Sequence, residues 1–318
     1  MASKPRKPFA DYAVYLAVRL VVMVVHALPP QLALKLADGI AWLAYRVNKR
    51  HRLVAADNIA HAFPTLMPAA VDQMVRATYR HFVRVAVEMV LLPRKLHVVS
   101  WRRYVNLYPW QPAIAATLSP RPGLVVTAHF GNWELAGWMM GLAGMKTYAI
   151  ARVLDNPHLE RFLKRLRQGT GQTIIAKKDD FDRLNEVMKG GGKVATLADQ
   201  DAGPRGLFVD FFGRPASTHK AVALMALEFD APLTVIGVPR VPAPPGVPGG
   251  GSLMYYAIVA EDVIDPRDYA GRPDAVRAIT ERYTAAVERL IRRHPEQYFW
   301  LHRRWKTRPA ARKAKAAA

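Results

Sequence analysis

Residues 124–138 read LVVTAHFGNWELAGW and join a short apolar run to a segment with helical character. The opening run is rich in β-branched residues, which is typical of a buried strand. Gly131 permits a tight turn, and Asn132 is a good N-cap for the helical segment that follows. The stretch therefore predicts a strand, a turn and a helix in immediate succession.

Two polar side chains in this stretch, His129 and Glu134, are five positions apart. In one continuous helix that step rotates by about 140°, so the two would point away from each other. They can meet if His129 lies just past the strand and Glu134 lies in the first helical turn, where the helix dipole favours an ionised carboxylate. A carboxylate that accepts the Nδ1 proton of His129 leaves Nε2 as a base. Spacing alone favours a simpler interpretation, a loop histidine beside an ordinary first-turn acid.

A base needs a proton to remove, and the sequence restricts where the nucleophile can be. The chain contains no cysteine and no Gly-x-Ser-x-Gly elbow. We therefore expect the substrate to supply the nucleophile, most simply a hydroxyl that attacks an activated acyl group. Backbone N–H groups at the helix start could stabilise the oxyanion. The lack of cysteine also suits a reducing compartment.

Short apolar runs alternate with helical segments after Pro122. The runs are residues 123–128, 146–152, 172–176, 193–199, 233–240 and 253–261. This alternation predicts an α/β fold with a mixed, mostly parallel central sheet flanked by helices. Before it, residues 31–47 and 69–92 have apolar positions at helical spacing, and the prolines of 58–68 predict a turn between them. The Pro/Gly-rich segment 240–252 predicts a loop between the last two strands.

The N-terminal residues 12–28 form a nearly apolar run that predicts a membrane-associated helix. At 17 residues the run is at the short limit for a bilayer span, and Arg19 and His26 interrupt it. Basic residues flank it on both sides, and no small-residue cleavage site of a signal peptide follows. A helix in the membrane interface, a single span and a buried core helix are the three alternatives.

The formal charge is +21, from 46 Lys and Arg against 25 Asp and Glu, which favours an anionic partner. Nucleic acid would explain the charge but neither the apolar run nor the histidine–carboxylate pair, so we expect no nucleic-acid partner. A basic and aromatic cluster near the C-terminus is typical of the headgroup zone of a bilayer. The cluster consists of Trp300, Arg303, Arg304, Trp305 and Lys306.

Five blocks of sequence occur in a recognisable order. They are NIAHAFP (58–64), HFGNWE (129–134), ARVLDNPHLERFLKRLRQGTG (151–171), LADQDAGPRGLFVDFFGRPASTHKAVALMAL (197–227) and PEQYFWLHRRWKTRP (295–309). The second resembles the His-x4-Asp/Glu motif of glycerolipid-type acyltransferases. Together the blocks resemble the bacterial lipid A biosynthesis (late) acyltransferases, within the lysophospholipid-acyltransferase-like superfamily.

The resemblance implies an enzyme that moves a fatty acyl chain from an acyl-carrier-protein thioester to a hydroxyl of a lipid A precursor, without a cofactor. It implies that His129 is the general base and Glu134 its partner. The implied location is the cytoplasmic face of a bacterial inner membrane. The implied partners are acyl carrier protein, an anionic glycolipid acceptor and membrane lipids. Coenzyme A remains an alternative donor, and phosphatidylinositol mannosides remain alternative acceptors, because related enzymes share the motif.

Further residues are expected to bind substrate. Arg152 follows a predicted strand and suits an anionic phosphate or the thioester end of the donor, although an ordinary exposed arginine would look the same. Asn132 and Asn156, each at a predicted helix start, belong to the same set, and so does Arg214 as a candidate phosphate contact. The helix predicted after Asn156 is amphipathic and basic, which suits an anionic lipid surface or an acidic carrier protein.

Asp199 and Asp201 end a predicted strand, at the spacing with which metal-dependent glycosyltransferases hold a divalent ion. Such a glycosyltransferase is the alternative function from a different class. The resemblance requires no metal, so we expect Asp199 to have a structural role or to provide polar positioning near the site, and we include it among the substrate-binding residues. The expected organisation is a basic, membrane-anchoring helical region at 1–50, an acyltransferase domain at 51–309 and a basic disordered tail at 310–318.

Overall fold

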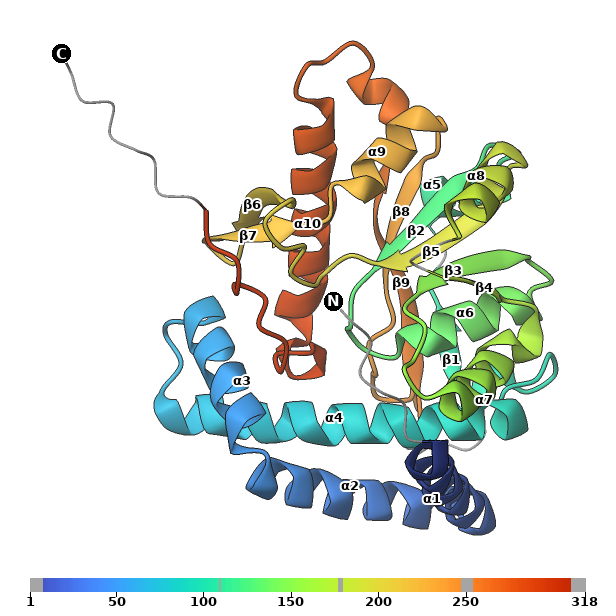
Figure 1. Ribbon diagram of the computed structural model, residues 1–318, viewed down its shortest axis with the longest axis vertical. Coiled ribbons are helices and arrows are strands. Elements are labelled where there is room, and N and C mark those ends of the chain that lie inside the picture. Colours follow the sequence, from blue (N-terminus) through green and yellow to red (C-terminus); the bar gives the residue numbers. More distant parts are fainter. Residues whose placement is uncertain (1–7, 109, 177–179, 247–253, 310–318) are drawn as a thin grey trace.

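A seven-stranded sheet forms the centre of the molecule in the computed structural model, which describes residues 8–108, 110–176, 180–246 and 254–309 (Figure 1). In spatial order the strands are β1 (Val105–Leu107), β9 (Tyr256–Ile264), β8 (Leu233–Gly237), β2 (Gly123–Thr127), β5 (Lys193–Leu197), β3 (Thr147–Ala151) and β4 (Thr173–Ala176). Neighbouring strands are parallel except β8 and β9, which are antiparallel. The predicted mixed, mostly parallel α/β sheet is confirmed.

Six of these strands lie where the sequence predicts strands. The short β1 was not expected, nor was the separate hairpin of β6 (Leu207–Phe211) and β7 (Arg214–Thr218). The loop predicted at 240–252 does join the antiparallel strands β8 and β9; its residues 247–253 lie outside the described part of the chain, as does the tail predicted at 310–318.

Helices cover both faces of the sheet because alternate strand residues point to opposite sides. Leu233 and Val235 of β8 pack with α10 (Ala275–Arg293), whereas Ile236 packs with α6 (Trp133–Leu142). The remaining helices of this half are α5 (Gln111–Leu118), α7 (Pro157–Arg167), α8 (Phe181–Lys189) and α9 (Ala221–Glu228). The α6 side carries the predicted functional stretch.

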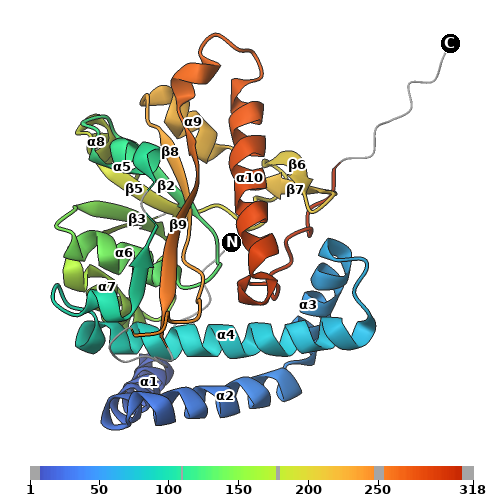
Figure 2. The ribbon, with the colours of Figure 1, turned by 180° about the vertical axis from the view of Figure 1, so that it is seen from behind.

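Four helices precede the sheet in the chain, and Figures 1 and 2 both show α4 (Pro68–Lys95) running across the base of the sheet. On the far side of α4 lie α1 (Pro8–Ala27) and α2 (Pro30–Val47). Small residues of α2, including Ala33 and Ala37, are fully buried with α4 side chains. The region predicted as 1–50 is thus packed onto the rest of the chain, and its boundary falls at the start of α3 (Lys49–Ala62).

The outer surface of α1 and α2 is apolar and exposed. In α1 the structure buries only Val25, and α1 is the one helix of the described residues that is long and apolar enough to cross a membrane. The alternative of a buried core helix is therefore wrong. The exposed side chains include Phe9, Leu16, Leu20, Val21 and Met23 of α1 with Leu32, Ile40, Trp42, Leu43 and Val47 of α2. An exposed apolar surface of this extent is typical of membrane contact.

The turn predicted at 58–68 is wrong for its first part, because α3 continues to Ala62. Ile59 and Ala62 are buried, and the helix ends only at the following Phe63 and Pro64. Asn58 is also buried, and its side-chain amide donates hydrogen bonds to the carbonyls of Trp300 and His302 at 2.7 and 2.8 Å. Two of the quoted sequence blocks therefore meet in the fold.

The C-terminal basic and aromatic cluster is mostly buried, contrary to prediction, and of its five members only Arg303 and Lys306 are exposed. Trp300 and Arg304 are only 1% and 2% exposed, and Trp305 is buried with them. The Arg304 guanidinium donates to the carbonyl of Ser217 and to Oγ1 of Thr218, both at 2.6 Å. Contacts with β7, 86 and 87 positions earlier in the chain, decide this burial, and the local sequence does not reveal them.

Replacing Arg304 with alanine should lower the free energy of unfolding by about 2–4 kcal/mol, because it leaves a void, removes the donor to Thr218 Oγ1 and removes one of the two donors to the Ser217 carbonyl. Urea denaturation in detergent micelles measures the change. The matched control is Arg303→Ala, which removes the same charge from an exposed side chain and should change stability by less than about 0.5 kcal/mol. Equal effects of the two substitutions would contradict the structural role of Arg304.

Candidate active site

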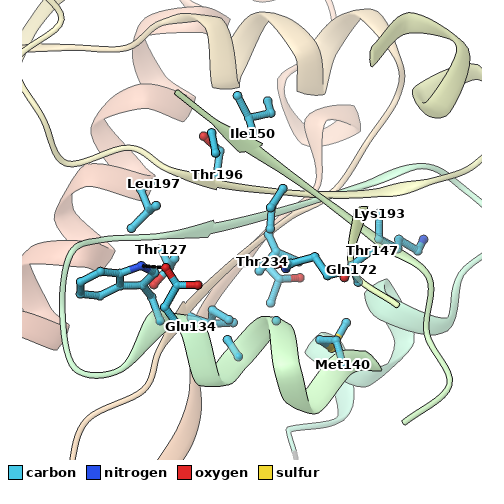
Figure 3. A pocket seen from close by; sticks show the side chains of 18 of the residues that line it. Thr127, Glu134, Met140, Thr147, Ile150, Gln172, Lys193, Thr196, Leu197 and Thr234 are labelled. Atoms are coloured by element: carbon cyan, nitrogen blue, oxygen red, sulfur yellow. Dashed lines mark hydrogen bonds between the residues drawn. The ribbon is translucent and has the colours of Figure 1, made fainter. Parts of the chain in front are cut away.

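A cavity of about 1170 Å³ lies around the sheet and is lined from both of its faces. Ile150 and Thr196 lie on one side of the strands, and Thr127, Thr234 and Thr147 on the other (Figure 3). Most of the lining is apolar, with α5 and α6 contributing Ala113, Ile114, Leu118, Ala136, Met139 and Met140. Such a chamber can accept a large apolar group.

The part of the cavity beneath α6 follows the strands along their length. His129 lies at one end, just beyond β2, and Lys193 lies at the other, at the start of β5. The four-residue advance from Lys193 to Leu197 alone spans roughly 13 Å at the rise of a β-strand. The Lys193 ammonium donates hydrogen bonds to the carbonyls of Ser119, at 2.8 Å, and of Arg121, so backbone acceptors bind it at the far end. Ala149 and Ala195, which are paired in register, leave the middle open.

His129 is held by Asp199. Its Nδ1 lies 2.9 Å from Asp199 Oδ1, and its backbone N–H donates to Oδ2 at 3.1 Å. The contact arises from topology: β2 and β5 are parallel neighbours, with Thr127 opposite Leu197, so the residues two beyond each strand meet at the same edge. The Asp199 side chain is 3% exposed, which shields the pair from water. Asp199 is therefore the group that fixes the imidazole tautomer.

Glu134 does not take this place, and the prediction that it accepts the Nδ1 proton is wrong in the structure. Its carboxylate pairs with Arg167 at the end of α7, with Nε to Oε2 at 2.9 Å. The Trp133 indole N–H also donates to Glu134 Oε1, at 3.1 Å. Glu134 does lie in the first turn of α6 and lines the cavity, as expected. It is a charged neighbour of His129 rather than its hydrogen-bond partner.

The environment shifts both members of the His129–Asp199 pair toward their charged forms. Burial alone lowers the pKa of the His129 imidazole, but the charge and hydrogen bond of Asp199, with the charge of Glu134, outweigh burial and raise it above 6.5. Burial alone raises the pKa of Asp199, but the charge of His129 and hydrogen bonds from it hold that pKa below 3.8. The carboxylate therefore stays ionised while the imidazole gains and loses a proton.

Two aromatic rings fix the plane of the imidazole. The centroids of Trp133 and Phe299 lie 5.2 and 5.9 Å from that of His129, and the Phe299 N–H donates to the His129 carbonyl at 3.0 Å. Within the described residues, Nε2 has no hydrogen-bond partner, and His129 lines the cavity. The geometry leaves Nε2 as a base directed at whatever enters.

Asn132 supports the helix rather than the cavity. It is fully buried, and its side-chain oxygen accepts from the Leu135 N–H at 3.2 Å, as the N-cap of α6. Its amide nitrogen lies 3.4 Å from the buried carboxylate of Glu88 on α4. Glu88 also pairs with Arg240 and accepts from the Tyr256 hydroxyl. The expected substrate contact of Asn132 is replaced by a network that fixes the start of α6.

The other predicted site residues are spread out. Arg152 does line the cavity, as an exposed side chain that pairs with Asp155 at 3.1 Å. Asn156 caps α7 and donates to the Asp11 carbonyl of α1 at 2.7 Å, so it is structural here. Arg214 lies on β7 with its guanidinium over the Trp305 ring, and it does not line the cavity. Sequence reasoning missed Arg167, whose partner in α6 only the packing of α7 reveals.

The two aspartates of the glycosyltransferase alternative do not converge. Asp199 bonds His129, whereas Asp201 accepts from the Gly203 N–H at 3.2 Å and from the Thr307 hydroxyl at 2.9 Å. Across the described ranges no group of three or more His, Cys, Asp or Glu side chains is arranged to hold a metal ion. The carboxylates are used by protein donors, so the arrangement does not fit a nucleotide–metal site.

Comparison with known proteins agrees with this chemistry. The family model for bacterial lipid A biosynthesis acyltransferases matches residues 3–307. A lipid A biosynthesis palmitoleoyltransferase of Escherichia coli is 27% identical over 86% of this chain and 85% of its own length, and a lauroyltransferase of that organism is 26% identical over 91% and 90%. A phosphatidylinositol mannoside acyltransferase of Mycobacterium tuberculosis is 28% identical over 52% of this chain and 54% of its own.

The substitution Asp199→Asn should lower the pKa of His129 to below 6.5, because burial, which disfavours the imidazolium, is then no longer outweighed. Titration of isotope-labelled histidine by NMR measures the pKa in both proteins. Asp201→Asn removes the same charge two residues away and should leave the His129 pKa unchanged. An unchanged value in Asp199→Asn would show that Asp199 does not govern the imidazole.

Proposed function

Since the chain belongs to the bacterial lipid A biosynthesis acyltransferase family, we propose that it transfers a fatty acyl chain from an acyl-carrier-protein thioester to a hydroxyl of a lipid A precursor. The observation that carries the proposal is the position of His129, whose Nδ1 is bound by Asp199 and which lines a long, mostly apolar cavity. A base beside such a cavity suits a reaction between a hydroxyl and a fatty acyl group.

In the proposed reaction, His129 Nε2 removes the proton of the acceptor hydroxyl as its oxygen attacks the thioester carbonyl. The tetrahedral intermediate collapses, the carbon–sulfur bond breaks, and the imidazolium returns the proton to the departing thiolate. Asp199 stabilises the imidazolium and keeps Nδ1 protonated throughout. The protein needs no nucleophile of its own, which agrees with the absence of cysteine from the sequence.

The start of α6 is the proposed oxyanion site. Within the loop before it, the Gly131 and Asn132 N–H groups donate to the Gln297 and Val238 carbonyls at 3.0 and 2.8 Å, so they are occupied. The Leu135 N–H is capped by Asn132. The first-turn N–H groups of Trp133 and Glu134 have no intrahelical acceptor and are the candidate donors. Glu134 then serves by holding Arg167 and by favouring the imidazolium electrostatically.

The part of the cavity beneath α6 is the proposed site for the acyl chain. Its carboxyl end would lie at His129, and its methyl end would extend past Ala149 and Ala195 toward Lys193. The exposed apolar surface of α1 and α2 supports attachment to a membrane, which we propose to be the cytoplasmic face of the inner membrane. The net charge of +21 favours an acidic carrier protein over coenzyme A as donor.

Sequence similarity supports a second class of acceptor lipid. The similarity to the mycobacterial phosphatidylinositol mannoside acyltransferase covers about half of each chain, so the same chemistry on another glycolipid is the alternative. The His129 site would be identical in both cases, because only the acceptor side differs. Lipid mass spectrometry with each acceptor distinguishes them.

Membranes that carry the protein should add one acyl chain to a lipid A precursor supplied with acyl carrier thioester, as weighed by mass spectrometry. His129→Ala and Asp199→Asn should each lower turnover by roughly 10² to 10⁴, with the fold intact. Wild-type turnover should fall as the pH drops through the raised pKa of His129, because only the neutral imidazole accepts a proton.

Asp201→Asn is the control for this series and should retain turnover, since its carboxylate contacts loop residues rather than His129. Turnover of folded His129→Ala at the wild-type rate would disprove the general base. Product formed with a mannosylated phosphoinositide and not with the lipid A precursor would replace the proposed acceptor and leave the reaction unchanged.

Ala195→Leu should shift the enzyme toward shorter acyl chains, because the larger side chain fills the middle of the cavity. Turnover with a sixteen-carbon donor should fall by about tenfold or more relative to a short-chain donor. Competition between the two donors in one reaction measures the ratio, and the short-chain product controls for folding. An unchanged ratio would place the acyl chain elsewhere.

A further inference from the structure

A second groove, of about 960 Å³, lies between α1 and the rest of the chain. One end of α1 is attached where Asn156 donates to the Asp11 carbonyl, and the other where His26 Nε2 contacts the Val90 carbonyl at 3.0 Å. Between these contacts the groove is lined by α1, the end of α4, the end of α6 and the outer face of α7. None of His129, Asp199, Glu134 and Arg167 lines it.

The lining is apolar with positive charge at its edge. Its apolar members include Leu16, Leu20, Met23, Leu96, Phe162 and Leu166. Arg19 comes from α1 and Arg165 from α7, and no aspartate or glutamate is among the residues that line the groove. The groove therefore favours a molecule with an anionic group and an apolar body.

Arg19 is the residue that requires explanation. It interrupts α1, the one helix of the described residues that could cross a membrane, where an unpaired charge is costly. Its guanidinium donates to the Tyr15 hydroxyl at 3.1 Å and lies 5.6 Å from the Phe162 ring centroid, and within the described residues it forms no ion pair with a carboxylate. A negative charge from outside the protein would complete its surroundings.

Arg165, like Arg19, lacks an acidic partner within the described part of the chain. Its Nε contacts only the Arg161 carbonyl, at 3.4 Å, and among the described residues it has no acidic partner. Arg167, two residues further along the same helix, is by contrast paired with Glu134. The helix thus directs a neutralised arginine to the active site and an unneutralised one to the groove.

We propose that this groove binds one anionic phospholipid of the bilayer, with its phosphate between Arg19 and Arg165 and an acyl chain along the apolar wall. Guanidinium groups suit phosphate oxygens, and an acyl chain suits the leucine-rich wall. A bilayer lipid fits better than the acceptor, because the groove adjoins the exposed apolar surface of α1 and excludes the His129 site. The inference rests on the proposed membrane attachment through α1.

The test uses the full-length protein in detergent micelles. Native mass spectrometry counts bound lipid during titration with phosphatidylglycerol or with zwitterionic phosphatidylcholine. The double variant Arg19→Gln/Arg165→Gln should bind phosphatidylglycerol about thirty-fold more weakly than wild type, at roughly one kcal/mol for each cation removed. The control Arg161→Gln/Lys164→Gln removes two exposed cations from α7 outside the groove and should weaken binding by less than about threefold.

Equal weakening in both double variants would overturn the proposal in favour of diffuse surface attraction, and so would equal binding of phosphatidylcholine and phosphatidylglycerol. Displacement of bound phosphatidylglycerol by inorganic phosphate alone, or by a lipid A precursor at equal concentration, would also overturn it, as evidence for a free-anion or an acceptor site. Acyl transfer in micelles is measured in parallel. Neither Arg19 nor Arg165 lines the reaction cavity, so loss of groove binding with retained turnover separates this inference from the proposed enzymatic function.

Discussion

The hydrogen bond between His129 Nδ1 and Asp199 is the contact on which the site depends, and the parallel pairing of β2 with β5 produces it. Because neighbouring parallel strands end at the same edge, a histidine after one and a carboxylate after the other are brought together without any special loop. Burial alone would neutralise both groups, but their mutual attraction outweighs it. The remaining Nε2 then faces a cavity that the same sheet lines.

The helix α6 divides the molecule into a catalytic and a supporting side. One face packs Leu135 and Trp138 against α4, and the other contributes Gly137 and Met140 to the cavity. The start of α6 is fixed from below by Glu88, a buried acid whose cost is offset by Arg240, Tyr256 and Asn132. A shift of this network would displace the first-turn N–H groups and Glu134 together, so α4 influences the site without contacting the cavity.

Charge is divided between the two faces of α7 in the same way. Arg167 is neutralised by Glu134 inside the reaction site, whereas Arg165 is left for the groove beside α1. The excess positive charge of the sequence is therefore not confined to residues on a solvated surface. Some of the cations lie beside apolar helix surfaces, and this combination of residues is typical of a membrane interface. Another cation, Arg304, attaches the C-terminal segment to β7 by its hydrogen bonds.

The sequence alone determined the strand–turn–helix around His129, the six principal strands and the apolar N-terminal helix, because periodicity, caps and turn residues act locally. It also determined which polar residues stand at strand ends. Only the tertiary structure decided which of them meet: Asp199 is 70 positions from His129 and reaches it through strand order, whereas Glu134, five positions away, is turned to Arg167 on α7. The burial of Trp300 and Arg304 was decided in the same way. Contacts between distant segments depend on which elements pack together, and local sequence patterns do not specify that packing.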